Sequence, residues 1–291
     1  MLNRVKKLIT NKIIENNIIK KYSLIIGESP SKGARSPVLW NAAYEKHKIQ
    51  AKMYPADVSK KNIKKLIVAL RSDKNFSAAV ITNPYKEIVY KLLKKNSSNL
   101  AKKIKSVNCI YKKNSLFYIT NTDSEASFLA IKKKINLKKK NSILILGFGG
   151  AGKAVALAFN QFLRNKKIYV ATRKKTKNKT KEIIFINWKK INNIIKNITI
   201  CINCTTVGFG KKILESPLSL DQIKKFNKKT IVYDIIYNPR VSTFLKNSKI
   251  NKLKTINGIR MNLLQAALAF NLANNLSRTD KKTFFAMKNI V

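Results

Sequence analysis

The chain has 291 residues, enough for two domains with hydrophobic cores, and its 45% of hydrophobic residues excludes a disordered protein. Its apolar runs, such as residues 143–146, are far too short for a transmembrane helix, which needs roughly 18 apolar residues. The net charge of +48 would suit a polyanionic partner. However, the lysines are spread over the whole chain, and Asn and Ile are also abundant, so A/T-rich codon use explains all three residue types. We therefore expect no nucleic-acid partner.

The first predicted elements alternate between strand and helix. Residues 1–21 are basic and predict an N-terminal extension, with an amphipathic helix or a transit segment as the alternatives. Transit peptides favour Arg and Ser over the Lys and Asn found here, which argues against a transit segment. The next segments predict strands at 22–27 and 76–82 and helices at 38–46, 60–70 and 87–94. This alternation predicts a mostly parallel sheet with helices on its faces.

A second α/β series starts near Asn141. It predicts strands at 142–146, 168–171, 198–203 and 230–236 and helices at 151–162 and 261–274. We therefore predict two α/β domains, with a glycine-rich loop opening the second.

The glycine-rich loop matches the dinucleotide-binding pattern G-x-G-x-x-G. It lies between an apolar strand and a helix, as the pattern requires, and comprises Gly147, Phe148, Gly149, Gly150, Ala151 and Gly152. Its glycines permit a tight turn, close approach of the backbone to a pyrophosphate, and close packing of helix on strand. The helix N-terminus adds free amides and a favourable dipole for phosphate.

The residues after the second strand of this series indicate which dinucleotide binds. An NAD site places Asp or Glu there to bind the ribose hydroxyls. This chain has Thr172-Arg173-Lys174-Lys175, and Arg173 can form a two-pronged contact with a 2′-phosphate. Because lysine is common throughout the chain, Lys174 and Lys175 do not discriminate between the two dinucleotides. Thr172 and Arg173 do, and they favour NADP.

The cysteines and the single histidine do not indicate a metal or redox site. Three cysteines in a chain of this length indicate a reducing compartment, and we expect a cytoplasmic protein. Cys201-x-x-Cys204 lies in a strand-like run without a second ligand pair, which predicts no metal site. His47 stands between two lysines of a predicted helix and is expected to face solvent, so imidazole acid/base catalysis is not predicted.

Five groups of segments, in order along residues 22–276, resemble the shikimate dehydrogenase family. They are Ser36-Pro37 with Asn41-Ala42-Ala43; Thr82-Asn83-Pro84-Tyr85-Lys86-Glu87; Val107-Asn108 with Asn121-Thr122-Asp123; the glycine loop with Thr172-Arg173 and Asn203-Cys204-Thr205; and Tyr233-Asp234 with Tyr237-Asn238-Pro239, Gly258-Ile259-Arg260-Met261 and Gln265-Ala266-Ala267.

The resemblance implies a role for each matching position. Lys86 is expected to be the catalytic acid/base, with Asp123 as its partner. The residues expected to hold the substrate are Ser36, Thr82, Asn108, Tyr237 and Gln265. Gly258 and Met261 are expected to contact the nicotinamide.

The chemistry of ketone reduction agrees with these roles. The reaction needs a hydride on carbon and a proton on oxygen, and a lysine ammonium can stabilise the developing charge and donate that proton. A neighbouring aspartate would hold the ammonium in place and favour its charged form.

Three positions depart from the family's pattern. Ala34 replaces the first serine of Ser-x-Ser-Pro in a loop about one residue longer, where Ser29 or Ser31 would be the replacement hydroxyl and Arg35 a source of charge. Ser124 and Arg260 stand where glycine is common. Binding of the substrate carboxylate is therefore the feature that the sequence leaves open.

The resemblance completes the prediction. We expect a substrate-binding α/β domain (22–122 and 257–291) and a Rossmann-like NADP-binding domain (123–256), with a cleft between them. The expected function is NADP-dependent shikimate dehydrogenase, which reversibly reduces 3-dehydroshikimate to shikimate in aromatic amino acid biosynthesis. The alternatives are a quinate/shikimate dehydrogenase and, more distantly, a polyanion-binding protein that kept the fold. We expect a monomer or homodimer outside the membrane.

Overall fold

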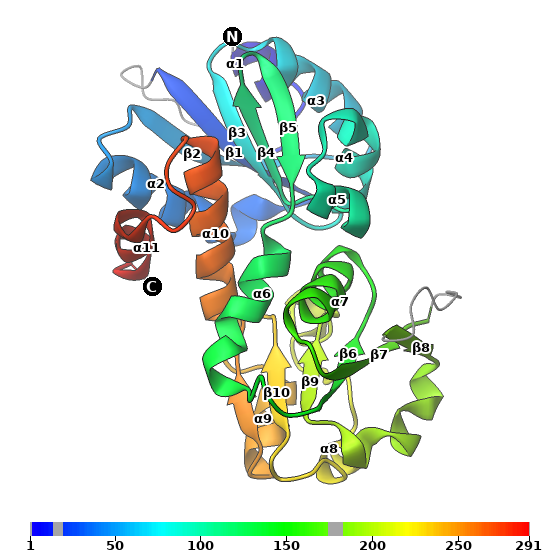
Figure 1. Ribbon diagram of the computed structural model, residues 1–291. Helices are drawn as coiled ribbons and strands as arrows, with labels where there is room; N and C mark the ends of the chain where they lie inside the picture. The colour runs from blue at the N-terminus through cyan, green and yellow to red at the C-terminus, as the bar shows by residue number, and fades with distance from the viewer. Residues whose placement is uncertain (1, 14–19, 174–182, 291) are drawn as a thin grey trace. The chain divides into compact units, whose positions relative to one another are not determined.

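The computed structural model of the chain describes residues 2–13, 20–173 and 183–290 (Figure 1). It consists of two compact units, Met1–Thr122 with Leu263–Val291, and Asp123–Asn262. Each unit contains one β-sheet with helices on it, so the predicted α/β class is confirmed.

Unit 1 contains sheet A, with strand order β2-β1-β3-β4-β5. Its strands are β1 (Lys21–Gly27), β2 (Ala51–Asp57), β3 (Phe76–Ile81), β4 (Cys109–Lys113) and β5 (Leu116–Thr120). β1 pairs with β2 and β3 in parallel, whereas β4 is antiparallel to both β3 and β5. Successive residues of a strand face opposite sides, so Leu24 and Ile26 lie in one core and Ile25 in the other.

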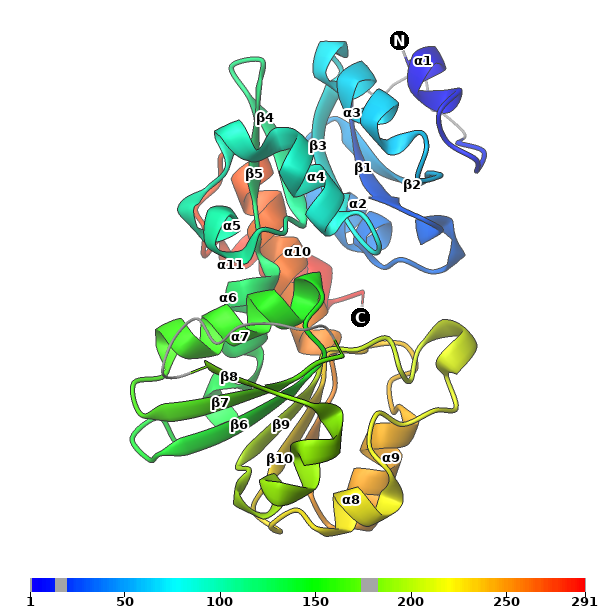
Figure 2. The same ribbon diagram turned by 90° about the vertical axis from the view of Figure 1, so that its right-hand side faces the viewer.

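The helices of unit 1 cover both faces of sheet A (Figures 1 and 2). They are α1 (Leu2–Lys6), α2 (Ser36–Lys46), α3 (Ile63–Ser72), α4 (Lys86–Leu93), α5 (Asn99–Ile104), most of α10 (Ile259–Ala273) and α11 (Lys281–Lys288), with 3-10 turns η1 (Pro30–Lys32) and η2 (Lys94–Asn96).

The N-terminal segment lies along the edge strand β2. Val5 and Ile13 are buried in the core of unit 1. The amide of Asp57 donates to Oδ1 of Asn11 at 2.7 Å, and Nδ2 of Asn11 donates to the carbonyl of Pro55 at 3.0 Å. The segment therefore satisfies backbone groups that an edge strand otherwise exposes.

Asn11→Ala is expected to lower the free energy of unfolding by about 1–2 kcal/mol, because it leaves two backbone groups of β2 without these partners. Urea denaturation measures the change. The matched control is Lys12→Ala, which removes an exposed neighbouring side chain. Equal stability of the two variants would contradict the role given to Asn11.

Unit 2 contains sheet B, which is entirely parallel with the order β11-β10-β9-β6-β7-β8. Its strands are β6 (Asn141–Leu146), β7 (Lys166–Ala171), β8 (Ile183–Ile186), β9 (Ile200–Asn203), β10 (Ile231–Asp234) and β11 (Lys254–Ile256). Numbered along the chain, this is the Rossmann order 3-2-1-4-5-6 read from β8 to β11, with its switch point between β6 and β9.

Helices cover both faces of sheet B (Figure 2). α8 and α9 share a core with Leu144 and Leu146, and α7 lies on the other face. The elements are α6 (Asp123–Ile131), α7 (Gly150–Phe162), α8 (Leu220–Lys224) and α9 (Thr243–Ile250), with 3-10 turns η3 (Lys132–Lys134), η4 (Trp188–Asn193), η5 (Ile195–Asn197) and η6 (Gly210–Lys212). Ligands of such sheets bind beyond the carboxyl ends of the strands, at the switch point.

Candidate active site

The glycine loop links β6 to α7 at the switch point of sheet B. Gly147 has φ +93°, a conformation that favours glycine. A β-carbon on Gly152 would collide with the carbonyl oxygen of Gly147, so the third glycine permits the close packing of α7 on β6. A β-carbon on Gly149 would meet no atom within 4 Å, so open space lies beside the second glycine.

The N-terminus of α7 offers a place for a phosphate. Gly150 and Ala151 form its first turn, and the preceding Gly149 makes no side-chain cap. The amides of this turn therefore lie beside the open space at Gly149, where the helix dipole favours an anion. This geometry fits the pyrophosphate of a dinucleotide.

The end of β7 fits the 2′-phosphate of NADP. Thr172 is buried, and its amide donates to the carbonyl of Ile186 at 3.3 Å. Arg173 follows and is exposed. Lys174 and Lys175 lie outside the described residues. The described end of this strand thus presents a guanidinium where an NAD site has a carboxylate.

A buried carboxylate network ties the loops after β9 and β10. Asp234 Oδ1 accepts from Nδ2 of Asn203 at 3.1 Å, and its Oδ2 accepts from the hydroxyl of Ser242 at 2.6 Å. Oδ1 of Asn203 accepts from the amide and hydroxyl of Thr205 at 3.0 and 2.7 Å. The sequence showed Asn203, Thr205 and Asp234 only as parts of family-like segments and gave them no role.

Burial raises the pKa of Asp234 to about 6, although hydrogen bonds from Ser242, the amide of Ile236 and Asn203 oppose the rise. The folded state therefore binds a proton more tightly than the unfolded state, whose pKa is near 3.8. This contribution to stability is complete below the unfolded pKa and is lost as the pH rises through about 6.

Relative to Asp234→Asn, the wild-type chain should gain about 1.4 kcal/mol in unfolding free energy between pH 7.5 and pH 5. The comparison cancels the other titrating groups, which both proteins share. Urea denaturation of the two proteins at both pH values measures the gain. A pH-independent difference would show that the carboxyl group has an ordinary pKa.

Three predicted or neighbouring polar residues meet in unit 1. Asn108, before β4, donates from Nδ2 to Thr122 Oγ1 at 2.9 Å and to Gln265 Oε1 at 3.3 Å. The hydroxyl of Thr122 donates to the carbonyl of Gln265 at 3.0 Å. The structure therefore brings together Asn108 and Gln265, which are far apart in the sequence, and adds Thr122, which the sequence left without a role.

Lys86 begins α4, two residues after Pro84 of the cis Asn83-Pro84 bond. Its carbonyl accepts from the amide of Val107, so the backbone of Lys86 lies beside the segment that carries Asn108. Thr82 directly follows β3, and its methyl group occupies the space that a side chain on Gly27 would need. These contacts place Lys86, Thr82 and Asn108 on adjoining segments of unit 1.

The remaining predicted residues are distributed over both units. Ser36 is buried at the start of α2 in unit 1. Asp123 follows Thr122 directly and begins α6, which is assigned to unit 2. Tyr237, Gly258 and Met261 also belong to unit 2.

Gly258 has a structural reason to be glycine. A β-carbon there would collide with the carbonyl of Ile235, and its amide donates to the carbonyl of Ile236 at 2.9 Å. The start of α10 is therefore fixed against the loop after β10. Contact of Gly258 and Met261 with the nicotinamide stays a prediction.

Comparison with known proteins also indicates a dinucleotide-dependent dehydrogenase. Residues 25–110 match the family model of the shikimate dehydrogenase substrate binding domain. The chain is 34% identical over 263 residues to the NADP(+) shikimate dehydrogenase of Methanosphaera stadtmanae, covering 85% of this chain and 89% of that protein. The chain belongs to the shikimate dehydrogenase family.

Solved structures of shikimate dehydrogenases resemble this one along nearly the whole chain. Shikimate dehydrogenase 1 of Peptoclostridium difficile is 28% identical with a TM-score of 0.78, covering 93% of this chain and 97% of its own. A shikimate dehydrogenase in complex with NADP+ is 25% identical with a TM-score of 0.79, covering 94% and 96%. The predicted resemblance and fold are confirmed.

In the loop that departs from the shikimate dehydrogenase pattern, one of the two candidate replacement serines is bonded to a carboxylate of unit 1. Ser31 donates from its hydroxyl to Asp57 Oδ2 at 2.5 Å and from its amide to Oδ1 at 2.8 Å. Ser29 precedes η1 and is exposed, without a side-chain cap bond. Ala34 packs against the core, so Ser36 is the buried serine of this loop.

The two further departures lie at helix starts. Ser124 is buried in the first turn of α6, and its carbonyl accepts from the hydroxyl of Ser127 at 2.7 Å. Arg260 is exposed in the first turn of α10.

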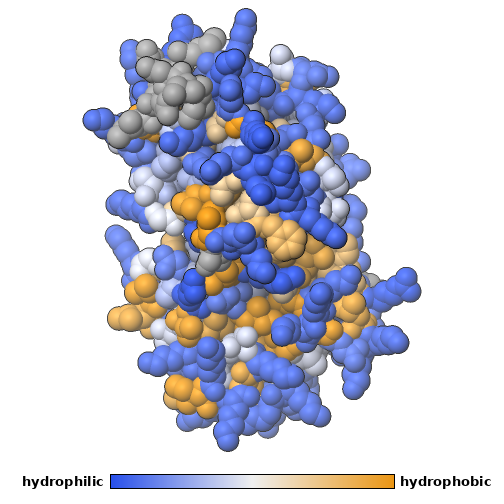
Figure 3. Space-filling view, turned by 90° about the vertical axis from the view of Figure 1, so that its left-hand side faces the viewer, coloured by the Kyte–Doolittle hydropathy of each residue, from blue (hydrophilic) through white to orange (hydrophobic). Residues whose placement is uncertain are grey.

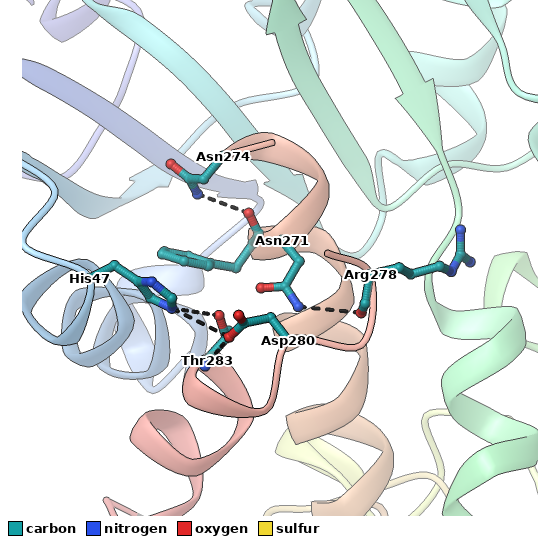
Figure 4. A network of polar contacts seen from close by, with 7 residues as sticks. His47, Asn271, Asn274, Arg278, Asp280 and Thr283 are labelled. Atoms are coloured by element: carbon teal, nitrogen blue, oxygen red, sulfur yellow. Dashed lines mark hydrogen bonds and ion pairs between the residues drawn. The ribbon is translucent and has the colours of Figure 1, made fainter. Parts of the chain in front are cut away.

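The prediction that His47 faces solvent is wrong. Its side chain is only 9% exposed, and Nε2 lies 2.9 Å from the hydroxyl of Thr283 and 3.6 Å from Asp280 (Figure 4). The cause is α11, which packs on α2 from the far end of the chain and was invisible in the local pattern. His47 thus has a structural role inside unit 1.

The cysteines give no sign of a metal site. Cys109, Cys201 and Cys204 are all buried free thiols. Burial raises the pKa of Cys109 to about 12, which keeps this thiol protonated. Among the described residues, no group of three His, Cys, Asp or Glu is placed to hold a metal ion.

Proposed function

We propose that this chain is an NADP-dependent shikimate dehydrogenase that reversibly reduces 3-dehydroshikimate to shikimate. The glycine loop with Arg173, in a chain 34% identical to an NADP(+) shikimate dehydrogenase, carries the proposal. Unit 1 would correspond to the substrate-binding domain and unit 2 to the NADP-binding domain.

Residues of the glycine loop and of the end of β7, all in unit 2, would hold NADP. The open space at Gly149 and the amides of Gly150 and Ala151 would accept the pyrophosphate. Thr172 and Arg173 would hold the 2′-phosphate. When bound, the nicotinamide supplies or accepts the hydride.

The residues of unit 1 would bind and protonate the substrate. Lys86 would stabilise the negative charge on the substrate oxygen and donate its proton. Asn108 and Gln265, already joined by a hydrogen bond, would orient the substrate's hydroxyls. The predicted pairing of Lys86 with Asp123 joins residues assigned to different units and stays a prediction.

Ser36, Thr82 and Tyr237 complete the proposed set of substrate contacts. We also propose a cytoplasmic monomer or homodimer; its mass in solution, measured by light scattering, decides between the two oligomeric states. None of the described helices is long and apolar enough to cross a membrane.

Arg173→Ala is expected to raise KM for NADP about tenfold or more and to leave KM for NAD within twofold, because only NADP carries the 2′-phosphate. Initial rates with each dinucleotide measure both constants. Arg164→Ala, which removes an exposed arginine of the same unit, is the control for general loss of positive charge. Equal effects of Arg173→Ala on the two dinucleotides would contradict recognition of the 2′-phosphate.

The proposal can be tested in a bacterium that lacks its own shikimate dehydrogenase. The wild-type chain should restore growth without aromatic amino acids, and the Lys86→Ala chain should not. The quinate/shikimate alternative is tested with purified protein: turnover of quinate comparable to that of shikimate would support it. Failure to restore growth by a chain that is expressed and folded would contradict the proposal.

A basic surface favours a second candidate, the binding of a polyanion such as RNA. The parallel strands of sheet B begin at one edge, and the segments there are rich in lysine. Residues 132–140 hold six lysines, and 164–167, 196, 225–229 and 252–254 add nine basic residues and no acidic one. The face in Figure 3 carries hydrophilic side chains over much of its area, with hydrophobic side chains gathered between them. Steeply salt-dependent RNA binding without dehydrogenase activity would favour this candidate.

A further inference from the structure

The loops that face the glycine loop are anchored by one buried carboxylate. Asp234 ends β10, and its side chain accepts three hydrogen bonds, from Asn203, Ser242 and the amide of Ile236. All three donors come from the carboxyl-terminal edge of sheet B or the loops that follow it. This is the edge that carries the glycine loop.

Asn203 connects Asp234 to the loop after β9 through hydrogen bonds. Its Nδ2 donates both to Asp234 and, at 3.1 Å, to the carbonyl of Val207. Its Oδ1 accepts from the amide and hydroxyl of Thr205. The hydroxyl of Thr205 in turn accepts from the amide of Val207 at 3.1 Å. Residues 203–207 therefore form a turn whose shape depends on the orientation of the Asn203 amide.

The turn packs directly against the glycine loop. The methyl group of Thr205 lies 2.9 Å from the position of a β-carbon on Gly147. The amide of Cys204 donates to the carbonyl of Leu146 at 2.9 Å, and Cβ of Cys204 lies 3.6 Å from the β-carbon position of Gly152. Thus the first and third glycines both pack against this turn.

We propose that Asp234 is a positioning residue of the dinucleotide site: through Asn203 it holds Thr205 against Gly147 and so fixes the glycine loop in the shape that binds the cofactor. The inference rests on the proposed binding of NADP. Asp234 makes its contacts to protein groups and acts through Asn203.

The chemistry of the site explains why a carboxylate is kept. Three donors point at Asp234, and an ionised carboxylate is an acceptor only. An asparagine could keep Oδ1 for Asn203 and Ile236 and turn its amide group toward Ser242, whose hydroxyl can accept. Asp234→Asn should therefore preserve most of the shape, whereas Asp234→Ala releases Asn203 and Ser242 together.

The test compares affinity for NADPH, measured by the change in its fluorescence on binding, with thermal stability. Asp234→Ala is expected to raise Kd for NADPH about tenfold, and Asp234→Asn less than threefold. The matched control is Asp73→Ala, a buried carboxylate of unit 1 that accepts from the hydroxyl of Tyr22 and the amide of Asn75. It is expected to lower Tm and leave Kd unchanged.

Thr205→Val separates positioning from simple destabilisation, because it keeps the methyl group and removes the hydroxyl that Asn203 holds. If Asp234 acts along this path, Asp234→Ala should weaken NADPH binding less in the Thr205→Val background than in the wild type. The same comparison can start from Asp234→Asn if Asp234→Ala does not fold. In steady-state assays, KM for NADPH should rise much more than kcat falls.

Two results would overturn the inference: an unchanged Kd in Asp234→Ala despite a lower Tm, or fully additive effects of Asp234→Ala and Thr205→Val. The proposed activity fails separately, if the wild-type chain binds NADPH but does not turn over shikimate. A wild-type chain that binds no NADPH would overturn both.

Discussion

Lys86→Ala is expected to lower kcat for shikimate oxidation about a hundredfold to ten-thousandfold, with folding intact. Lys86 stands in the first turn of α4, beside the segment that carries Asn108, and its backbone carbonyl holds the amide of Val107. Alanine keeps that backbone contact and removes the side chain beyond the β-carbon, including the ammonium. The loss should therefore appear in the chemical step.

Two variants make this result specific. Lys91→Ala removes an exposed lysine from the same helix and should keep kcat within twofold. Lys86→Arg keeps the positive charge but is a poor proton donor because of its high pKa, so it should recover little activity. Circular dichroism and Tm confirm folding. Near-normal turnover by a folded Lys86→Ala chain would show that another group transfers the proton.

Alanine at the second or the third glycine of the loop should weaken NADPH binding, but only alanine at the third should strongly lower stability. In Gly152→Ala the new methyl group meets the carbonyl of Gly147, and a backbone atom cannot move aside without shifting α7 or β6. We expect a loss of about 3 kcal/mol or more in unfolding free energy. NADPH binding should be lost with it.

Gly149→Ala is the matched variant, because its β-carbon meets no atom within 4 Å and its φ of −78° suits alanine. Its unfolding free energy should stay within about 1 kcal/mol of wild type. NADPH affinity should still fall at least about tenfold, since the methyl group fills the space that the pyrophosphate approaches. Urea denaturation and NADPH titration of both variants measure these effects. Wild-type affinity in Gly149→Ala would contradict the proposed place of the pyrophosphate.

The features predictable from the sequence are those with local signals. The apolar strand at 142–146, the glycines after it and the helix that follows form one continuous pattern, and the structure shows them as β6, the glycine loop and α7. The same holds for the strand at 22–27, a short apolar run that is buried on both faces, and for the helix at 87–94, where apolar periodicity marks the buried face.

Some features could not be predicted from local patterns. β2 contains Pro55, which argues against a central strand, but β2 is an edge strand whose outer backbone groups are bound by Asn11. The β4–β5 hairpin turns at Asn114-Ser115, both with positive φ, and this pair lacks the glycine of the usual hairpin signal. The predicted orientation of His47 is wrong because its partner Thr283 lies 236 residues away in the sequence.

The residues of the site also divide into those that a local pattern or the family resemblance indicates and those that only the folded chain brings together. Arg173 and the glycines were identified from spacing, and Lys86 from family resemblance. The role of Asp234 could not be predicted, because its partner Asn203 ends β9, and only the order of sheet B places that strand beside β10. The gathering of lysines at the opposite edge of that sheet was equally hidden in a chain with lysines throughout.

The most direct test of the central proposal is the initial rate of shikimate oxidation by the purified chain, followed by the absorbance of reduced nicotinamide, with NADP and with NAD. We predict turnover with shikimate and NADP, and a kcat/KM for NADP at least about tenfold above that for NAD. No turnover of shikimate with either dinucleotide, by a folded chain, would contradict the proposed function.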